Sequence, residues 1–163
     1  MKNLFLYCVA VLFVAGSLSS CEKDNSPTGE SPEEQGAHFS VMLNGNPYVV
    51  EDEFRAYAYD LDNQITINGV GDLDANESVV VGLPQGFTTG TYTMVPAGDT
   101  YAVAIIDGIA YNTQLTGSSG EVTITKNDGV NMEGTFQFMA KGGDQLQHTL
   151  EAMEGEFQVK LRD

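Results

Sequence analysis

The segments Gly134-Thr135-Phe136-Gln137-Phe138 and Gly155-Glu156-Phe157-Gln158-Val159 decide the fold class of this chain. In each segment a glycine is followed by apolar side chains at every second position, which is the period of a strand with one face on a core and one in solvent. Because the two segments share one pattern, we expect them to be neighbouring strands. A single echo does not indicate a repeat protein, since solenoids and propellers need three or more units.

The same two-residue period recurs through residues 37–163, and no apolar stripe with helical spacing extends over three turns. Turn-forming residues such as Asn44-Gly45, Asp107-Gly108 and Asn127-Asp128-Gly129 separate the runs. The pattern predicts an all-β domain, an antiparallel β-sandwich or open barrel of about 8–10 strands.

The expected strand segments are 39–43, 48–50, 54–60, 64–70, 78–83, 91–95, 101–106, 109–115, 121–126, 133–141, 148–152 and 156–161. Their alternation assigns a set of side chains to the core. These are Phe39, Val41, Leu43, Ile65, Ile67, Val79, Val81, Val122, Ile124, Phe136, Phe138, Phe157, Val159 and Leu161.

The N-terminus predicts export from the cytoplasm. Lys2 precedes an apolar run from Leu4 to Ala15, and small residues lead to Cys21. Twelve or so apolar residues rise only ~18 Å as a helix against a hydrocarbon core of ~30 Å, so a signal peptide over residues 1–20 is favoured over a membrane span. The Leu18-Ser19-Ser20-Cys21 box resembles the bacterial lipobox, which implies lipidation of Cys21. The alternative is an ordinary signal peptide in which Cys21 happens to fall near the cut.

Residues 21–36 are expected to be the lipidated Cys and a flexible acidic tether. From Glu22 to Gln35 there is no strongly apolar residue, whereas Pro27 and Pro32 occur, so this segment cannot bury enough surface to offset the entropy of ordering it. Residues 37–163 then form a single all-β domain.

The charge of the chain excludes one class of partner. It has 7 basic and 23 acidic side chains, a formal net charge of −16. Binding to DNA or RNA depends on Lys and Arg that neutralise phosphates, so we expect no nucleic-acid partner. Cys8 lies in the predicted signal peptide and Cys21 is predicted to be lipidated, which leaves no thiol for a disulfide, a zinc site or thiol catalysis.

The order of features resembles the small uncharacterised lipoproteins of Bacteroidota. The features are the lipobox, Lys23-Asp24 after the Cys, the acidic tether, a first hairpin at 39–45, and the strands at 120–125, 134–138 and 155–159. The resemblance implies a β-sandwich-like domain anchored in the outer membrane and, from Lys23-Asp24, exposed at the cell surface. Asn25 stands where a second acidic residue is expected in that export signal. The resemblance assigns no activity to any residue.

The best candidate for ligand binding is the strand Phe54-Arg55-Ala56-Tyr57-Ala58-Tyr59. If Phe54, Ala56 and Ala58 face inward, then Arg55, Tyr57 and Tyr59 form an outward stripe that can stack on a sugar or dock a peptide. In the opposite phase, the tyrosines cover the edge of the core and the alanines face solvent.

Other polar motifs match known sites only in part. Asp72, Asp74, Asn76 and Ser78 alternate as in calcium loops, but Glu77 and Leu83 stand where such a loop needs Gly and Glu, so a polar hairpin loop is favoured. The acidic runs 51–53 and 60–63 are interpreted as solvated turns. His38 and His148 belong to no HExxH motif, and we expect no metal and no cofactor.

The sequence therefore predicts a lipid-anchored binding or adhesion module of the cell envelope without catalytic activity, whose ligand is a glycan or a protein. One alternative is an envelope assembly subunit with a protein partner. A less favoured one is a hydrolase with an acidic pair, since glycosidases need two carboxyl groups ~5–9 Å apart and the sequence does not pair any. It leaves the oligomeric state open.

Overall fold

The computed structural model describes residues 36–61, 63–74 and 76–162. These residues form eleven strands and one short 3₁₀ helix, which confirms the all-β prediction. The elements are β1 (His38–Leu43), β2 (Asn46–Val50), β3 (Ala56–Leu61), β4 (Gln64–Val70), β5 (Ser78–Pro84), β6 (Gly90–Met94), β7 (Tyr101–Ile106), β8 (Ile109–Asn112), β9 (Ser119–Asn127), β10 (Asn131–Gly142), η1 (Asp144–Leu146) and β11 (His148–Arg162). Within the described ranges no helix has the length and apolar character needed to cross a membrane.

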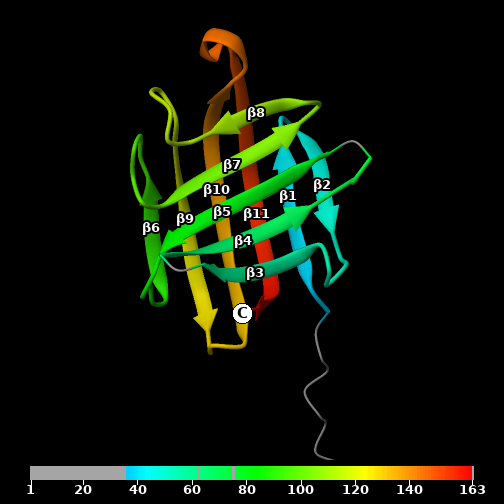
Figure 1. The fold of residues 1–163 in the computed structure, drawn as a ribbon, viewed down its shortest axis with the longest axis vertical. Coiled ribbons are helices and arrows are strands. Elements are labelled where there is room, and N and C mark those ends of the chain that lie inside the picture. Colours follow the sequence, from blue (N-terminus) through cyan, green and yellow to red (C-terminus); the bar gives the residue numbers. More distant parts are fainter. Residues whose placement is uncertain (1–35, 62, 75, 163) are drawn as a thin grey trace, which may run out of the picture. The chain divides into compact units, whose positions relative to one another are not determined.

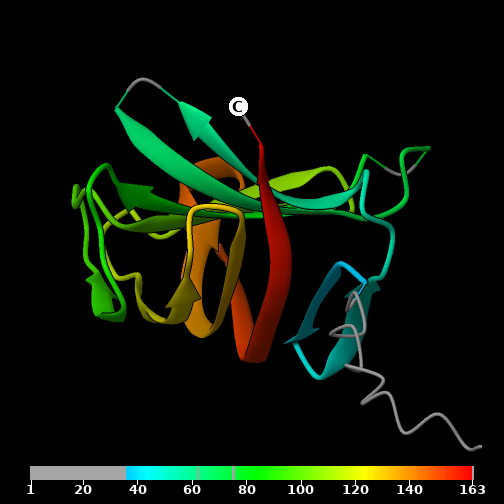
Figure 2. The same ribbon diagram turned by 90° about the horizontal axis from the view of Figure 1, so that it is seen from below.

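The strands make one mixed sheet that folds over on itself into two layers (Figure 1). One layer has the order β2-β1-β11-β10-β9-β6 and the other β3-β4-β5-β7-β8. The layers join where β11 pairs with β3 and where β10 pairs with β8, which closes a circuit of paired strands. Figure 2 shows the layers edge-on, with the red β11 passing from one to the other. The fold is thus a sandwich with the closed pairing of a barrel.

The last two predicted strands, 148–152 and 156–161, form the single strand β11. Glu154 has a left-handed backbone with φ of 54°, and the pairings of β11 with β1 and with β10 both shift register around it. Such a bulge adds one residue and reverses the alternation of faces. The reversal makes one continuous strand resemble two strands in the sequence.

Two further details differ from the prediction. The described strands number eleven rather than eight to ten. Even the short segments β6 and β8 count as separate strands, because β6 pairs with β9 and β8 pairs with β7. All described pairings are antiparallel except β11 with β3, which is parallel at Leu161 opposite Ala58 and Arg162 opposite Tyr59. This parallel pair arises because β11 is long enough to leave its own layer and reach the edge of the second one.

The predicted core is correct at all positions except Leu161. The other thirteen side chains are buried, with Phe39, Ile67, Val79 and Val81 at 0% exposure. Leu161 is only partly buried and packs against the core from its rim, because it lies where β11 turns towards the other layer.

The two echoing segments are cross-strand neighbours, as expected, and their glycines and phenylalanines pair reciprocally. Gly134 lies opposite Phe157, and Phe136 lies opposite Gly155. A Cβ atom on Gly134 would lie 2.2 Å from the carbonyl oxygen of Thr123 and 2.6 Å from Cζ of Phe157. Each ring therefore occupies the space that a side chain would need on the opposite strand.

Aromatic rings from the first layer also pack on glycines of the second. A Cβ atom on Gly69 would lie 2.3 Å from Cδ1 of Phe39, whose ring centroid is 5.2 Å from that of Phe136. The Tyr48 hydroxyl donates a hydrogen bond of 2.9 Å to the carbonyl of Gly69. Burial raises the pKa of Tyr48 to about 12, so this phenol stays protonated and keeps its donor at neutral pH.

We expect Gly134→Ala to lower the free energy of unfolding by about 1–3 kcal/mol, because the added methyl group overlaps the Thr123 carbonyl and the Phe157 ring. Urea unfolding followed by circular dichroism measures the change. Gly36→Ala is the matched control, since no atom lies within 4 Å of its added Cβ. Equal midpoints for the two variants would contradict the role assigned to this glycine.

Candidate functional site

Side chains along β3 alternate between the core and the outer surface, and the tyrosines are on the outer surface. Ala56 and Ala58 are buried at 1% and 0% exposure, so Tyr57 and Tyr59 share the face that points away from the core, whereas Arg55 lies in the turn that precedes the strand. Tyr57 is half-buried and Tyr59 is 38% exposed. The two tyrosines of the expected stripe therefore lie on the outer surface of β3.

Phe54 does not face inward as expected. It is 74% exposed, because the chain makes a turn before β3 begins. The carbonyl of Asp52 accepts the amide of Ala56 at 2.7 Å, and the Asp52 carboxylate accepts the amide of Phe54 at 2.8 Å. The turn removes Phe54 from the alternation of the strand and leaves its ring at the surface beside the tyrosines.

Arg162 completes this surface, although it is not among the site residues expected from the sequence. Its backbone lies opposite Tyr59 in the parallel pair, and its guanidinium carbon lies 4.7 Å from the ring centroid of Tyr57 and 5.8 Å from that of Phe54. It also donates a hydrogen bond to the carbonyl of Glu53. No local pattern at the end of the chain indicates that Arg162 reaches the 54–59 stripe, because the contact depends on a non-local parallel pairing.

Arg55 has a different role from the one expected for a free ligand-binding cation. Its Nη1 donates 2.9 Å to the carbonyl of Gly71, and its Nε lies 3.3 Å from the Asp52 carboxylate. These contacts tie the turn before β3 to the loop after β4. Arg55 thereby holds the position of its neighbours Phe54 and Tyr57.

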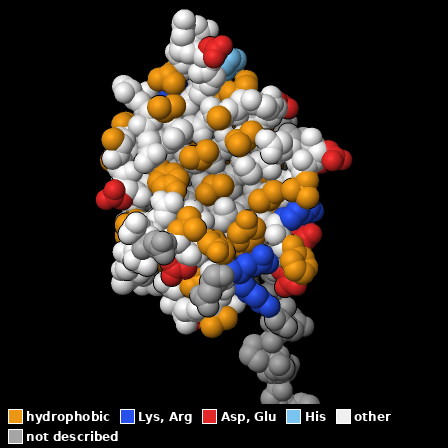
Figure 3. All heavy atoms as spheres, in the orientation of Figure 1, with side chains coloured by type: hydrophobic (Ala, Val, Ile, Leu, Met, Phe, Trp, Pro, Cys, Tyr) orange, Lys and Arg blue, Asp and Glu red, His pale blue; other side chains and the backbone are white. Residues whose placement is uncertain are grey.

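We call Phe54, Tyr57, Tyr59, Arg55 and Arg162 the β3 corner. Arg55, Lys160 and Arg162 are three of the five Lys and Arg residues in the described part of the chain. Lys160 pairs with Glu53 at 4.0 Å. In Figure 3 blue Lys and Arg side chains gather at the lower edge of one face, next to exposed apolar groups. The β3 corner thus combines aromatic rings and cations on a chain of net charge −16.

The rest of this face of the second layer is largely uncharged. The register sets Tyr57, Asn68, Val80 and Val103 in one row across β3, β4, β5 and β7. These four side chains are half-buried and alternate with the buried side chains of the core. Scattered apolar side chains are visible across the face in Figure 3.

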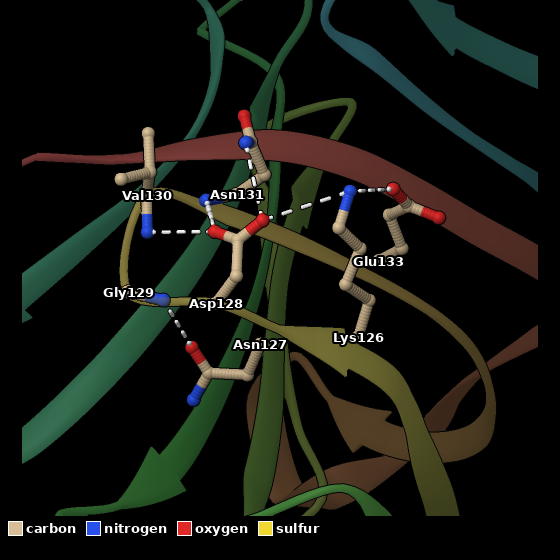
Figure 4. Close-up of polar contacts among 7 residues, drawn as sticks. All are labelled: Lys126, Asn127, Asp128, Gly129, Val130, Asn131 and Glu133. Carbon is tan, nitrogen blue, oxygen red and sulfur yellow. Dashed lines mark hydrogen bonds and ion pairs between the residues drawn. The ribbon is translucent and has the colours of Figure 1, made fainter.

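The turn between β9 and β10 supports the end of β11 that carries Arg162. The Asp128 carboxylate accepts the amides of Val130 and Asn131 at 2.9 and 2.7 Å, as Figure 4 shows. The carbonyl of Val130 in turn accepts the amide of Leu161 at 2.7 Å. The amide donors lower the pKa of Asp128 to about 2. The carboxylate is therefore ionised and fully hydrogen-bonded at neutral pH.

The first layer has a hollow of about 440 Å³ on its outer face, lined by residues that include Glu121, Glu154 and Glu156. The Glu121 carboxylate accepts the side-chain amide of Gln137 at 2.9 Å, and Glu156 contacts His38 at 3.1 Å. These carboxylates are one of the places where acidic side chains, as the hydrolase alternative requires, line a concavity. The hydrogen bonds hold both carboxylates against the sheet.

The remaining polar motifs lie in surface turns. The Asp72 carboxylate accepts the amide of Asp74 at 2.9 Å, which closes a turn before β5. In the described ranges no three His, Cys, Asp or Glu side chains converge as metal ligands would. His148 is exposed at the start of β11, far along the chain from His38. Cys21 lies outside the described residues.

A family model described as a domain of unknown function, DUF6252, matches residues 36–159. The chain belongs to the DUF6252 family. No curated protein and no solved structure matches the chain. The match covers the described strands up to Val159 and stops just before the end of β11, so Arg162 of this DUF6252 member lies beyond the matched segment.

We expect Asp128→Ala to lower the urea midpoint at pH 7, because the Val130 and Asn131 amides lose their acceptor. Since folding lowers the pKa of Asp128, its stabilising effect is present above the ordinary pKa and disappears as the pH falls towards 2. The difference between wild type and variant therefore shrinks between pH 4 and pH 2. Asp60→Ala is the control, as Asp60 is exposed at the end of β3. A difference that is constant with pH would contradict this role.

Proposed function

We propose that this chain is a non-catalytic binding or adhesion module that a lipid on Cys21 holds at the cell envelope. The N-terminal sequence supports the anchor, since a short apolar run ends in Leu18-Ser19-Ser20-Cys21. Two or three acyl chains contribute ~0.8 kcal/mol for each buried methylene, which suffices for stable membrane attachment. The resemblance to Bacteroidota lipoproteins supports the outer membrane as its location, with the domain exposed at the cell surface.

The β3 corner is the surface that this proposal assigns to the ligand. The observation that carries it is the Arg162 guanidinium 4.7 Å above Tyr57, beside the exposed rings of Phe54 and Tyr59. Tyr and Arg are enriched in binding hot spots, because they offer large contact area and directed donors. Exposing Phe54 at 74% costs hydrophobic free energy that a ligand would recover on covering the ring.

A second candidate function is that of an envelope assembly subunit. The uncharged row Tyr57, Asn68, Val80 and Val103 favours it, since the row extends the β3 corner across the face towards β7. A protein partner would cover both the corner and the row, whereas a small glycan would cover the corner alone. A photo-crosslinking residue at Val103 distinguishes them, because an assembly partner is captured there and a corner-bound glycan leaves it unreacted.

Metabolic labelling with palmitate tests the anchor. We expect the full chain to incorporate label and to sediment with membranes when expressed in a bacterium that processes lipoproteins. Cys21→Ser abolishes both, because it removes the thiol that accepts the diacylglyceryl group. Cys8→Ser is the matched control and retains the label, since Cys8 lies inside the predicted signal peptide. Labelling that survives Cys21→Ser would overturn the proposed anchor.

Binding assays with the detergent-purified full chain test the ligand surface. We expect Tyr59→Ser to weaken binding to glycans or envelope proteins on the order of tenfold, because the ligand loses an exposed ring at the centre of the corner. Val49→Ser is the control, as Val49 is 55% exposed but lies on β2 in the other layer. Equal affinities for both variants would show that the ligand binds elsewhere.

A further inference from the structure

Arg162 is held in a geometry suited to recognition. Its guanidinium lies near two rings, 4.7 Å from the centroid of Tyr57 and 5.8 Å from that of Phe54, and the Glu53 carbonyl accepts one of its N–H groups. A guanidinium fixed in this way has already lost most of the rotamer freedom that a ligand would otherwise have to remove. Stacking also leaves the edge of the planar group, where its donors point, free of ring atoms.

The donors of Arg162 define the chemistry of the ligand. A guanidinium has five N–H donors in a fixed plane, and Glu53 is its one described hydrogen-bond acceptor. The remaining donors form a fork that matches two oxygens of a carboxylate in a bidentate contact. The ligand group is therefore an oxyanion that approaches in the guanidinium plane.

The surrounding charges favour a single carboxylate over a polyanion. Arg55 and Lys160 are near Arg162, but Asp52 lies 3.3 Å from Arg55 and Glu53 lies 4.0 Å from Lys160. These acids neutralise most of the local positive potential, and the whole chain has a net charge of −16. Polyanions bind through many cations and are repelled by such a field, whereas one fork needs only one well-placed anion.

Tyr59, which carries an exposed aromatic ring, is the second residue of the proposed site. Tyr59 lies opposite Arg162 in the parallel pair on the same outer face, and it is 38% exposed. An aromatic face of this kind stacks on the C–H face of a sugar ring. The backbones of Tyr59 and Arg162 are one strand spacing of ~4.8 Å apart, and the guanidinium lies over Tyr57 and Phe54, so a ligand that contacts both the Tyr59 ring and the fork extends along β3 as well as across it.

We propose that Arg162 and Tyr59 bind an acidic sugar residue, with its carboxylate on the Arg162 fork and its ring against Tyr59. Phe54 and Tyr57 position the guanidinium, and Arg55 holds the turn that positions Phe54. The proposal deepens the binding function proposed above for the β3 corner and rests on it.

Calorimetry with the detergent-purified full chain tests this assignment. The probes are the methyl glycoside of galacturonate, an oligosaccharide with a single glucuronate and sialyllactose, each beside its neutral counterpart, and a Glu-rich peptide. We expect at least one acidic sugar to bind at least about tenfold more tightly than its neutral counterpart and than the peptide, since a charge-assisted bidentate contact is lost in the neutral sugar.

Substitutions distinguish the bidentate geometry of Arg162 from the effect of positive charge alone. We expect Arg162→Gln and Arg162→Lys each to weaken binding of the acidic sugar at least about tenfold, because lysine keeps the charge but lacks the planar fork. Lys141→Gln removes one positive charge from β10, where Lys141 contacts Thr149, and leaves the affinity unchanged. Unchanged circular dichroism and thermal midpoint verify that the Arg162 variants fold.

The outcomes distinguish this inference from the function on which it rests. If acidic and neutral sugars bind equally and only Tyr59→Ser weakens binding, the β3 corner is a ligand surface and the carboxylate assignment is wrong. If the Glu-rich peptide binds as tightly as the acidic sugars, the ligand is not a sugar. If none of the acidic sugars binds, or if Arg162→Lys binds as wild type, the assignment falls.

Discussion

The structure depends on the reciprocal packing of two phenylalanine rings on two glycines in the β10–β11 hairpin. Gly134 lies under Phe157 and Gly155 under Phe136, and no side chain fits at either glycine without displacing a ring or a backbone carbonyl. This pairing sets the register of the two longest strands. Because a slip of one residue would turn every side chain to the other face, the same contact determines which residues enter the core.

Because β11 is long, the register of the hairpin also sets where the end of β11 meets the β3 corner. The strand continues beyond Gln158, where its pairing with β1 ends, and its last residues cross to β3 in the second layer. The Asp128 turn holds this end of β11 through the Val130 carbonyl. The position of Arg162 over Tyr57 and Phe54 therefore depends on both the hairpin register and this turn.

Charge and shape are distributed unequally between the layers. The first layer carries a hollow lined by carboxylates whose hydrogen bonds lie within the sheet, and the second presents a mostly uncharged face with cations at one end. Because the chain as a whole is strongly acidic, the end of the second layer that carries the cations is where the electrostatic potential repels an anion least. Recognition there rests on the fixed geometry of one guanidinium and its adjoining rings rather than on long-range attraction.

The sequence by itself determined the strand-built fold class and all but one of the predicted core positions, because both follow from a two-residue period that is local in the chain. It left open which face of β3 the tyrosines occupy. It did not reveal that 148–162 is one strand, since the bulge at Glu154 reverses the alternation. It also placed Phe54 inward, where the Asp52 turn exposes it, and it missed Arg162. Only the tertiary structure decided the composition of the β3 corner, because a parallel pair between Ala58-Tyr59 and Leu161-Arg162 joins residues about a hundred positions apart and leaves no local signal in the chain.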